Sequence, residues 1–135
     1  MIKVIIDTNV FISGIFWSGP PFKILSAWRH QKLKLIYSAD ILEEYIRVGH
    51  VLSKKYKGVE ISSFIDLITI FGELHTPIVL DAAITDDPDD DKFIACALSA
   101  SCKYIISGDK HLLDVDGFSG IHVLKPAAFV KMHLS

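Results

Sequence analysis

Short, continuously apolar runs alternate along the chain with longer segments in which apolar residues recur at helical spacing. Runs such as Val4–Ile6 contain no polar residue, which is typical of strands that are covered on both faces of a sheet. The pattern predicts strands at Ile2–Ile6, Leu33–Tyr37, Thr76–Leu80, Tyr104–Ser107 and Ile121–Leu124.

The segments between these strands have the features of helices. Pro21 suits the first turn of a helix, and Ser38 is a residue type that caps helix N-termini. Because strands and helices alternate, we expect a single α/β domain over residues 1–135, with three layers (α/β/α) and a mostly parallel central sheet. Ser53–Ile61 is predicted to be a loop, and the predicted helices are Pro21–Gln31, Ala39–Leu52, Ser62–Leu74, Asp89–Ser101 and Pro126–His133.

Composition narrows the class of protein. Of the 135 residues 50% are hydrophobic, so the chain can bury a substantial core. No apolar run reaches the roughly 18 residues of a membrane span, and Asp7 and Asn9 interrupt the stretch that a signal peptide would need. We therefore expect a soluble cytoplasmic protein without membrane contact. Cys96 and Cys102 lack metal-binding spacing and are expected to be buried free thiols.

The net charge of −2 conceals an uneven distribution of charge along the chain. Lys and Arg outnumber acids from Phe22 to Lys57, whereas acids outnumber Lys from Asp81 to Asp116. The first segment could attract an anionic polymer, and the second could hold cations. Two ordinary solvated surfaces would explain the same distribution.

Several acids stand where predicted strands end or neighbouring helices begin. Asp7 directly follows the first strand, and Asp109 lies just beyond the fourth. In a parallel α/β sheet, functional residues gather beyond the carboxyl ends of the strands, so these acids are candidates for one site. Further candidates stand in the first turns of two predicted helices: Glu43, Glu44, Asp90 and Asp91.

Each acid also has a purely structural interpretation. Asp7 could cap a turn, and Asp109 lies within an ordinary turn sequence. The run Asp86–Asp91 could complement the dipole at a helix N-terminus, and Glu43 or Glu44 could be solvated helix residues. The functional hypothesis therefore depends on the set of acids and not on any one of them.

Converging carboxylates repel one another unless something neutralises them, and a divalent cation is the simplest neutraliser. Oxygen ligands favour Mg²⁺ or Mn²⁺ over zinc. Such ions polarise a phosphodiester and activate water, so a protein nucleophile is unnecessary. The histidines show no metal-binding spacing, and the chain has no phosphate-binding glycine loop. The acids thus indicate metal-dependent chemistry on a phosphodiester.

Four short segments each contain candidate acids: Val4–Val10, Ile41–Tyr45, Asp87–Phe93 and Tyr104–Leu113. In this order they resemble the acidic motifs of PIN domains, and the resemblance covers residues 2–113. The resemblance is closest to toxin components of prokaryotic toxin–antitoxin pairs. Glu44 matches the second acidic motif better than Glu43, and Asp90 is chosen as the third acid with Asp91 as its neighbour.

The resemblance implies a Rossmann-like α/β/α fold and Mg²⁺- or Mn²⁺-dependent endonucleolytic cleavage of single-stranded RNA. It also implies an antitoxin protein as a partner, and the apolar composition is compatible with a homodimer. Asn9 and Ser107 would support the acids as polar neighbours. The residues implied to be catalytic and to bind the metal, directly or through water, are Asp7, Glu44, Asp90 and Asp109, with Asp91 as a further metal ligand.

Two other functions compete with a nuclease. A phosphatase of the haloacid dehalogenase type would use Asp7 as a nucleophile, but its second Asp would have to stand where this chain has Asn9. A module that binds RNA or protein without cutting could use the basic segment Phe22–Lys57 and its aromatic residues. We expect most of those aromatic residues, which are Trp28, Tyr37, Tyr45 and Tyr56, to pack in the core.

Overall fold

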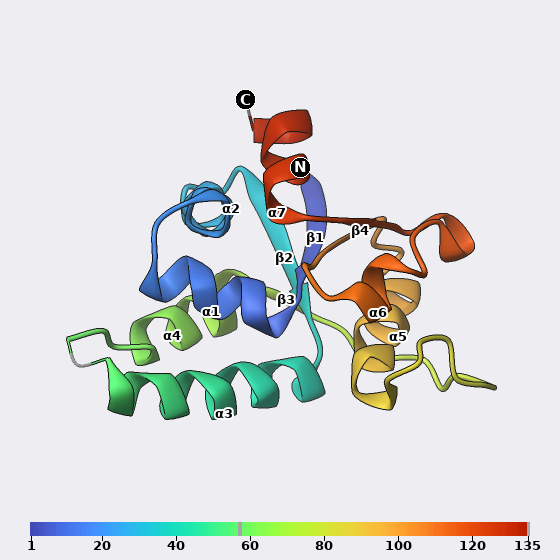
Figure 1. Ribbon diagram of the computed structural model, residues 1–135, viewed down its shortest axis with the longest axis horizontal. Coiled ribbons are helices and arrows are strands. Elements are labelled where there is room, and N and C mark those ends of the chain that lie inside the picture. Colours follow the sequence, from blue (N-terminus) through green and yellow to red (C-terminus); the bar gives the residue numbers. More distant parts are fainter. Residues whose placement is uncertain (57, 135) are drawn as a thin grey trace.

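The computed structural model describes residues 1–56 and 58–134, and a sheet lies between two groups of helices (Figure 1). Lys57, the last residue of the predicted basic segment, is outside the described residues. Along the described chain, every helix is too short or too polar to cross a membrane. Cys96 and Cys102 are buried and free, as the sequence predicted.

The sheet has the strand order β3-β2-β1-β4-β5. Its centre is β1 (Ile2–Ile6), which pairs with β2 (Leu33–Tyr37) on one side and β4 (Tyr104–Ile106) on the other. The edges are β3 (Glu73–Leu74) and β5 (His122–Leu124). All pairings between these described strands are parallel, so the three-layer α/β/α fold is confirmed and the sheet is more uniform than the predicted mostly parallel one.

The connecting helices divide between the two faces of the sheet (Figure 1). The first layer contains α1 (Thr8–Phe16), α2 (Pro20–Arg29), α3 (Ala39–Lys55) and α4 (Ser62–Phe71). The second layer contains α5 (Asp91–Ala100) and α6 (Lys110–Leu113), and the 3₁₀ turn η1 (Pro88–Asp90) leads into α5. The chain continues through η2 (Phe118–Gly120) to β5, and then through α7 (Pro126–Phe129) to the π-helical turn η3 (Val130–Leu134), which packs on α2.

Aromatic packing joins α1 to α3 within the core. Phe11 and Tyr45 are both completely buried, and their rings stack with centroids 4.2 Å apart and planes at 8°. The strand residues Val4–Ile6 are also fully buried, as expected for a strand covered on both faces. The two helices therefore have fixed positions next to the end of β1.

The prediction of a strand at Thr76–Leu80 was wrong. These residues lie outside the sheet, and Glu73–Leu74 pairs with β2 instead. Helix α4 consequently ends at Phe71, before Gly72, and not at Leu74 as predicted. Glycine is a weak helix former, so Gly72 favours the end of α4. Pairing with β2 then gives Glu73 and Leu74 the backbone hydrogen bonds that a longer helix would have provided.

Two helices were missed by the sequence pattern. Thr8 and Asn9, considered as turn residues, form the first turn of α1. The residues of α1 are largely apolar and several are β-branched, so its stability comes from packing more than from helix propensity. The short α6 was also missed, and α3 continues past Leu52 to Lys55, into the predicted loop.

Candidate active site

The carboxyl ends of β1 and β4 place Asp7 and Ser107 next to each other. The Asp7 amide donates to the Ile106 carbonyl oxygen at 2.9 Å, and the Ser107 amide donates to the Leu124 carbonyl oxygen at 3.0 Å. The sheet ladder thus continues one residue past the strands. The strand order reverses between β1 and β4, which is where open α/β sheets place their ligands.

Ser107 holds the Asp7 carboxylate in place. Its Oγ donates to Asp7 Oδ2 at 2.6 Å and accepts from the Asp109 amide at 2.9 Å. Asp7 is 5% exposed and Ser107 is fully buried, so this hydrogen-bonded chain is shielded from water. The predicted role of Ser107 as a polar support of the acids agrees with this geometry.

Burial is the main cause that raises the pKa of Asp7. The charges of Asp109 and Glu44 raise the pKa further, whereas the Ser107 hydroxyl opposes the rise by stabilising the carboxylate. Asp109 and Glu44 are therefore close enough to change the pKa of Asp7. An additional positive charge beside Asp7 would stabilise its ionised form.

Asp90 brings a third carboxylate from η1 to the same place. Its side chain is buried, and its Oδ2 has no hydrogen-bond partner among the described residues. Burial, with the charges of Asp109 and Asp7 adding to it, raises the pKa of Asp90 to about 7. A buried carboxylate oxygen without a partner costs stability and fits a site that receives a cation.

Asp7, Asp90 and Asp109 are called the acid cluster below. Glu44 comes near this cluster from α3, but its carboxylate already has protein partners. The Lys92 amine forms an ion pair with Oε2, and the Thr8 hydroxyl donates to Oε1. The Arg47 guanidinium lies 3.8 Å from Oε2. Glu44 thus links α3 to α1 and α5, and a protein cation neutralises its charge.

Tyr45, directly after Glu44, contacts the backbone of Ile6, the residue before Asp7. Its hydroxyl donates to the Ile6 carbonyl oxygen, and its ring is stacked against Phe11. Burial holds the pKa of Tyr45 well above its usual value, so the hydroxyl remains a donor. Sequence reasoning missed Tyr45, Thr8 and Lys92. The one available signal was Lys92, a lone base directly after a run of acids.

Asp91 faces a different part of the chain. Its carboxylate accepts hydrogen bonds from the Thr85 amide and hydroxyl, both at 2.8 Å, and from the Ile84 amide at 3.3 Å. These contacts anchor the loop before η1. The geometry therefore favours Asp90 over Asp91 as the third acid, and metal binding by Asp91 stays a prediction.

A cavity of about 350 Å³ opens beside two of the acids, Asp7 and Asp109. Asn9 contributes to its wall, although no hydrogen bond joins the Asn9 side chain to an acid within the described part of the chain. Its support of the acids therefore stays a prediction. The lining comes from α1, α2 and the segments after β1, β4 and β5: Asp7, Asn9, Val10, Ser13, Pro21, Gly108, Asp109 and Pro126.

The acids do not form a complete metal site as they stand. In residues 1–56 and 58–134, no three Asp, Glu, His or Cys side chains are grouped closely enough to hold a metal ion. Glu44 is turned to Lys92, and Asp7 to Ser107. The donors that fit a cation are the carboxylates of Asp7, Asp90 and Asp109, because they interact electrostatically and Asp90 keeps an unpaired oxygen.

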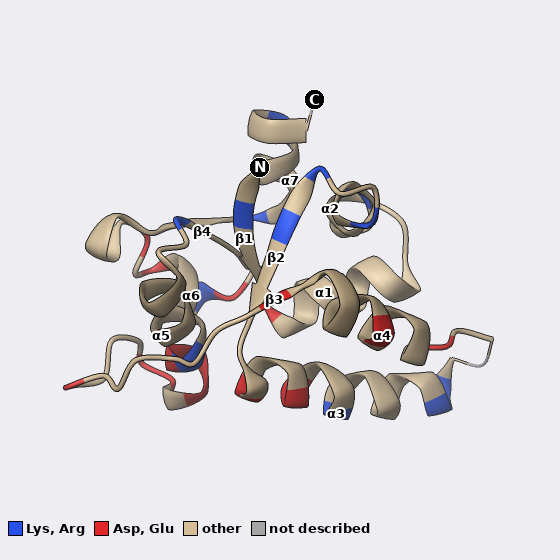
Figure 2. Ribbon diagram, turned by 180° about the vertical axis from the view of Figure 1, so that it is seen from behind, with Lys and Arg blue, Asp and Glu red and all other residues tan. Residues whose placement is uncertain are grey.

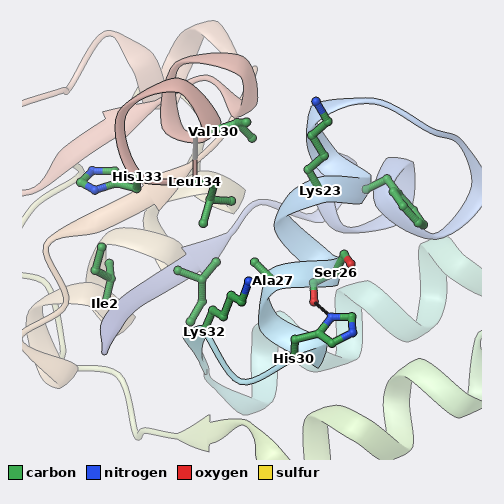
Figure 3. Close-up of a pocket in the computed structure, with 11 residues that line it drawn as sticks. Ile2, Lys23, Ser26, Ala27, His30, Lys32, Val130, His133 and Leu134 are labelled. Carbon is green, nitrogen blue, oxygen red and sulfur yellow. Dashed lines mark hydrogen bonds between the residues drawn. The ribbon is translucent and has the colours of Figure 1, made fainter.

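A larger cavity, of about 670 Å³, lies away from the acids, between α2 and the C-terminal turns (Figure 3). Its lining includes Ile2 and Leu33, which begin β1 and β2, so it is at the amino ends of the strands. None of its described lining residues is acidic, and Lys23 and Lys32 are among them. This cavity is therefore unsuited to a cation and separate from the acid cluster.

The raised pKa of Asp90 has a consequence for stability without metal. Between its ordinary pKa of 3.8 and its folded value of about 7, the unfolded chain loses the proton first, so ionisation destabilises the folded state as pH rises. We expect Asp90→Asn to raise the Tm in EDTA at pH 8 by at least about 3 °C. At pH 4 the same variant should melt near the wild type. An equal change in Tm at pH 4 and pH 8 would contradict the raised pKa of Asp90.

Two comparisons with known proteins show what the chain is similar to. Residues 3–111 match the family model of the PIN domain. The uncharacterized protein MJ1680 of Methanocaldococcus jannaschii is 35% identical over 118 residues, which span 84% of this chain and 75% of that relative. PIN domains are generally nucleases and typically use divalent metals. The chain belongs to the PIN domain family.

Proposed function

We propose that this protein is a metal-dependent endoribonuclease that cleaves single-stranded RNA. The observation that carries the proposal is that Asp7, Asp90 and Asp109 interact electrostatically beyond β1 and β4, with one buried carboxylate oxygen left without a partner. In a PIN domain, this arrangement supports hydrolysis of a phosphodiester assisted by Mg²⁺ or Mn²⁺.

The residues of the chain have distinct parts in this proposal. Asp7, Asp90 and Asp109 would hold the cation, directly or through water, while Ser107 and Tyr45 keep Asp7 in position. When bound, divalent ions supply activation of water and stabilisation of negative charge on the phosphate. Glu44, paired with Lys92, would order the neighbouring helices, and its binding of the metal stays a prediction.

The test is cleavage of a mixed pool of labelled RNA by purified protein with Mg²⁺, Mn²⁺ or EDTA. We expect internal cuts in unpaired regions with either metal and none in EDTA. The matched variants are Asp109→Asn, from the acid cluster, and Asp66→Asn, an exposed acid on α4. Equal cutting by wild type and Asp109→Asn would assign the activity to a contaminant.

Lysines at the end of α3 are proposed to contact RNA phosphates. Lys54 and Lys55 are exposed in the last turn of this helix. Replacing both with alanine should weaken RNA binding and flatten the plot of log affinity against log salt by about 1.4, because each contact to a single strand contributes about 0.7. The thermal response to Mg²⁺ should be unchanged. A loss of that response would show that the double substitution disturbs the acid cluster instead.

A second candidate is a PIN module that binds RNA or a protein without cutting. The observation that favours it is the incomplete grouping of metal-binding side chains among the described residues. Bound metal without cleavage of any tested RNA would support this candidate. We also propose, from the resemblance, that the protein is a toxin with an antitoxin partner and, from its composition, that it is cytoplasmic and homodimeric. Co-purification with the product of the adjacent gene tests the pairing.

A further inference from the structure

An exposed aromatic cluster lies at the far ends of α1 and α3, away from the acids. The rings of Trp17 and Tyr56 meet edge to face, with centroids 5.6 Å apart and planes at 79°, and Phe16 packs 6.0 Å from Tyr56. Trp17 is 48% exposed and Tyr56 is 39% exposed. Trp28, Tyr37 and Tyr45 of the basic segment are buried, as predicted for most of its aromatic residues. Core packing therefore does not account for this pair.

Helix α1 leads from the cavity beside Asp7 and Asp109 to the aromatic cluster. Asn9 and Ser13 line that cavity, and Trp17, the C-cap residue with an extended backbone, follows directly after the helix. Helices α1 and α3 both begin beside the acids and extend in the same direction (Figure 1). A helix of this length rises about 14 Å, which places the aromatic pair a few nucleotides from the acids.

The charge beside the cluster is positive. Lys54 and Lys55 occupy the last turn of α3, and the Lys55 amine lies 5.5 Å from the centre of the Tyr56 ring. Figure 2 shows acidic positions where α3 begins and basic positions where it ends. Exposed aromatic rings next to lysines suit a single-stranded nucleic acid, because bases stack on the rings while amines hold the phosphates.

We propose that Trp17 and Tyr56 form a base-stacking subsite that holds unpaired RNA one length of α1 away from the catalytic acids. The inference rests on the proposed function and adds a determinant of its substrate. Bases within a duplex are already stacked and paired, so this subsite selects single strands. Lys54 and Lys55 hold the backbone of the same segment.

A second copy of the chain is the main alternative occupant of this surface. Charge argues against it, because a symmetric contact would bring Lys54 and Lys55 of both copies together. RNA brings the opposite charge to the same lysines. Self-association through this face is therefore one of the outcomes that the experiment must detect.

The experiment measures RNA affinity in an Asp109→Asn background, so that the ligand is not cut. Fluorescence anisotropy with a labelled unpaired 12-nucleotide RNA is compared with a duplex of the same sequence. We expect Trp17→Ala and Tyr56→Ala each to weaken binding of the single strand at least about 5-fold, with a smaller change for the duplex. Trp17→Phe, which keeps a stacking ring, should restore most of the affinity.

The matched control is Phe22→Ala, a half-exposed aromatic residue on α2 outside the cluster. Thermal melting checks that each variant is folded, and quenching of Trp17 emission by RNA, absent in Trp17→Phe, reports contact directly. Unchanged affinity in a folded Trp17→Ala protein would overturn the subsite even if the enzyme still cuts RNA. A shift from dimer to monomer with unchanged RNA affinity would also overturn it, in favour of self-association. Affinity that depends on Trp17 without any cleavage would instead retain the subsite and reject the nuclease.

Discussion

Asp7→Asn is expected to lower the rate of metal-dependent RNA cleavage by about 100- to 1,000-fold. The carboxylate stands at the centre of the acid cluster and is held there by Ser107. Its loss removes a negative ligand from the cation, and metal-based stabilisation of a phosphate transition state is worth several kcal/mol, with roughly 1.4 kcal/mol for each factor of ten. Single-turnover cleavage of a labelled RNA at saturating Mg²⁺ measures the effect.

The same substitution should leave the fold and much of the RNA affinity intact. Asparagine can still accept the hydrogen bond from Ser107, and removal of a buried charge among acids relieves repulsion. We therefore expect an equal or higher Tm in EDTA and a smaller increase on addition of Mg²⁺. Asp66→Asn is the matched control and should cut at the wild-type rate. A full Mg²⁺ response in Asp7→Asn would count against Asp7 as a ligand.

Phe11→Ala is expected to destabilise the folded protein by about 3–5 kcal/mol. Phe11 is fully buried and stacks on Tyr45, so its removal leaves a cavity between α1 and α3. A domain of this kind is stable by only about 5–15 kcal/mol, so the loss is a large share of the total. Urea denaturation should show a lower midpoint with an unchanged slope.

Phe22→Ala is the comparison that isolates burial from residue type. Phe22 is 50% exposed on α2, so the same truncation should change the free energy of unfolding by less than about 1 kcal/mol. Phe11→Ala should also slow cleavage in the folded fraction, because Tyr45 loses the ring that positions its hydroxyl at the Ile6 carbonyl. Equal destabilisation by the two variants would contradict the packing described for α1.

Strands and helices with strong periodicity could be predicted from the sequence. β1 and β2 have the predicted bounds. Strands covered on both faces are largely apolar, so the local sequence alone identifies them. The edge strand β3 was misplaced, since the run Thr76–Leu80 has strand-like residues but pairing with β2 selects Glu73–Leu74. Pairing of this kind depends on tertiary contacts that local pattern does not contain.

For the site, the acids could be selected from the sequence because each follows a strand or begins a helix. The residues that contact those acids could not be predicted from the sequence. Lys92 pairs with Glu44 across the distance between α5 and α3, and Tyr45 reaches the Ile6 carbonyl from another helix. Such contacts follow from how the helices pack. The choice of Asp90 over Asp91 likewise depends on which way each side chain turns, and neighbouring residues of one helical turn differ by about 100°.

The two-residue length of β3 limits how copies of this protein can assemble. An exposed sheet edge recruits other chains through its free backbone amide and carbonyl groups, and a very short edge strand offers few of them. Continuous sheets and fibrils that grow from the β3 edge are therefore disfavoured. Around this edge, the exposed apolar side chains of Ile70, Phe71 and Leu74 offer contact area without a backbone template. Any association on this side would have to rely on side-chain packing, which selects its partner by shape.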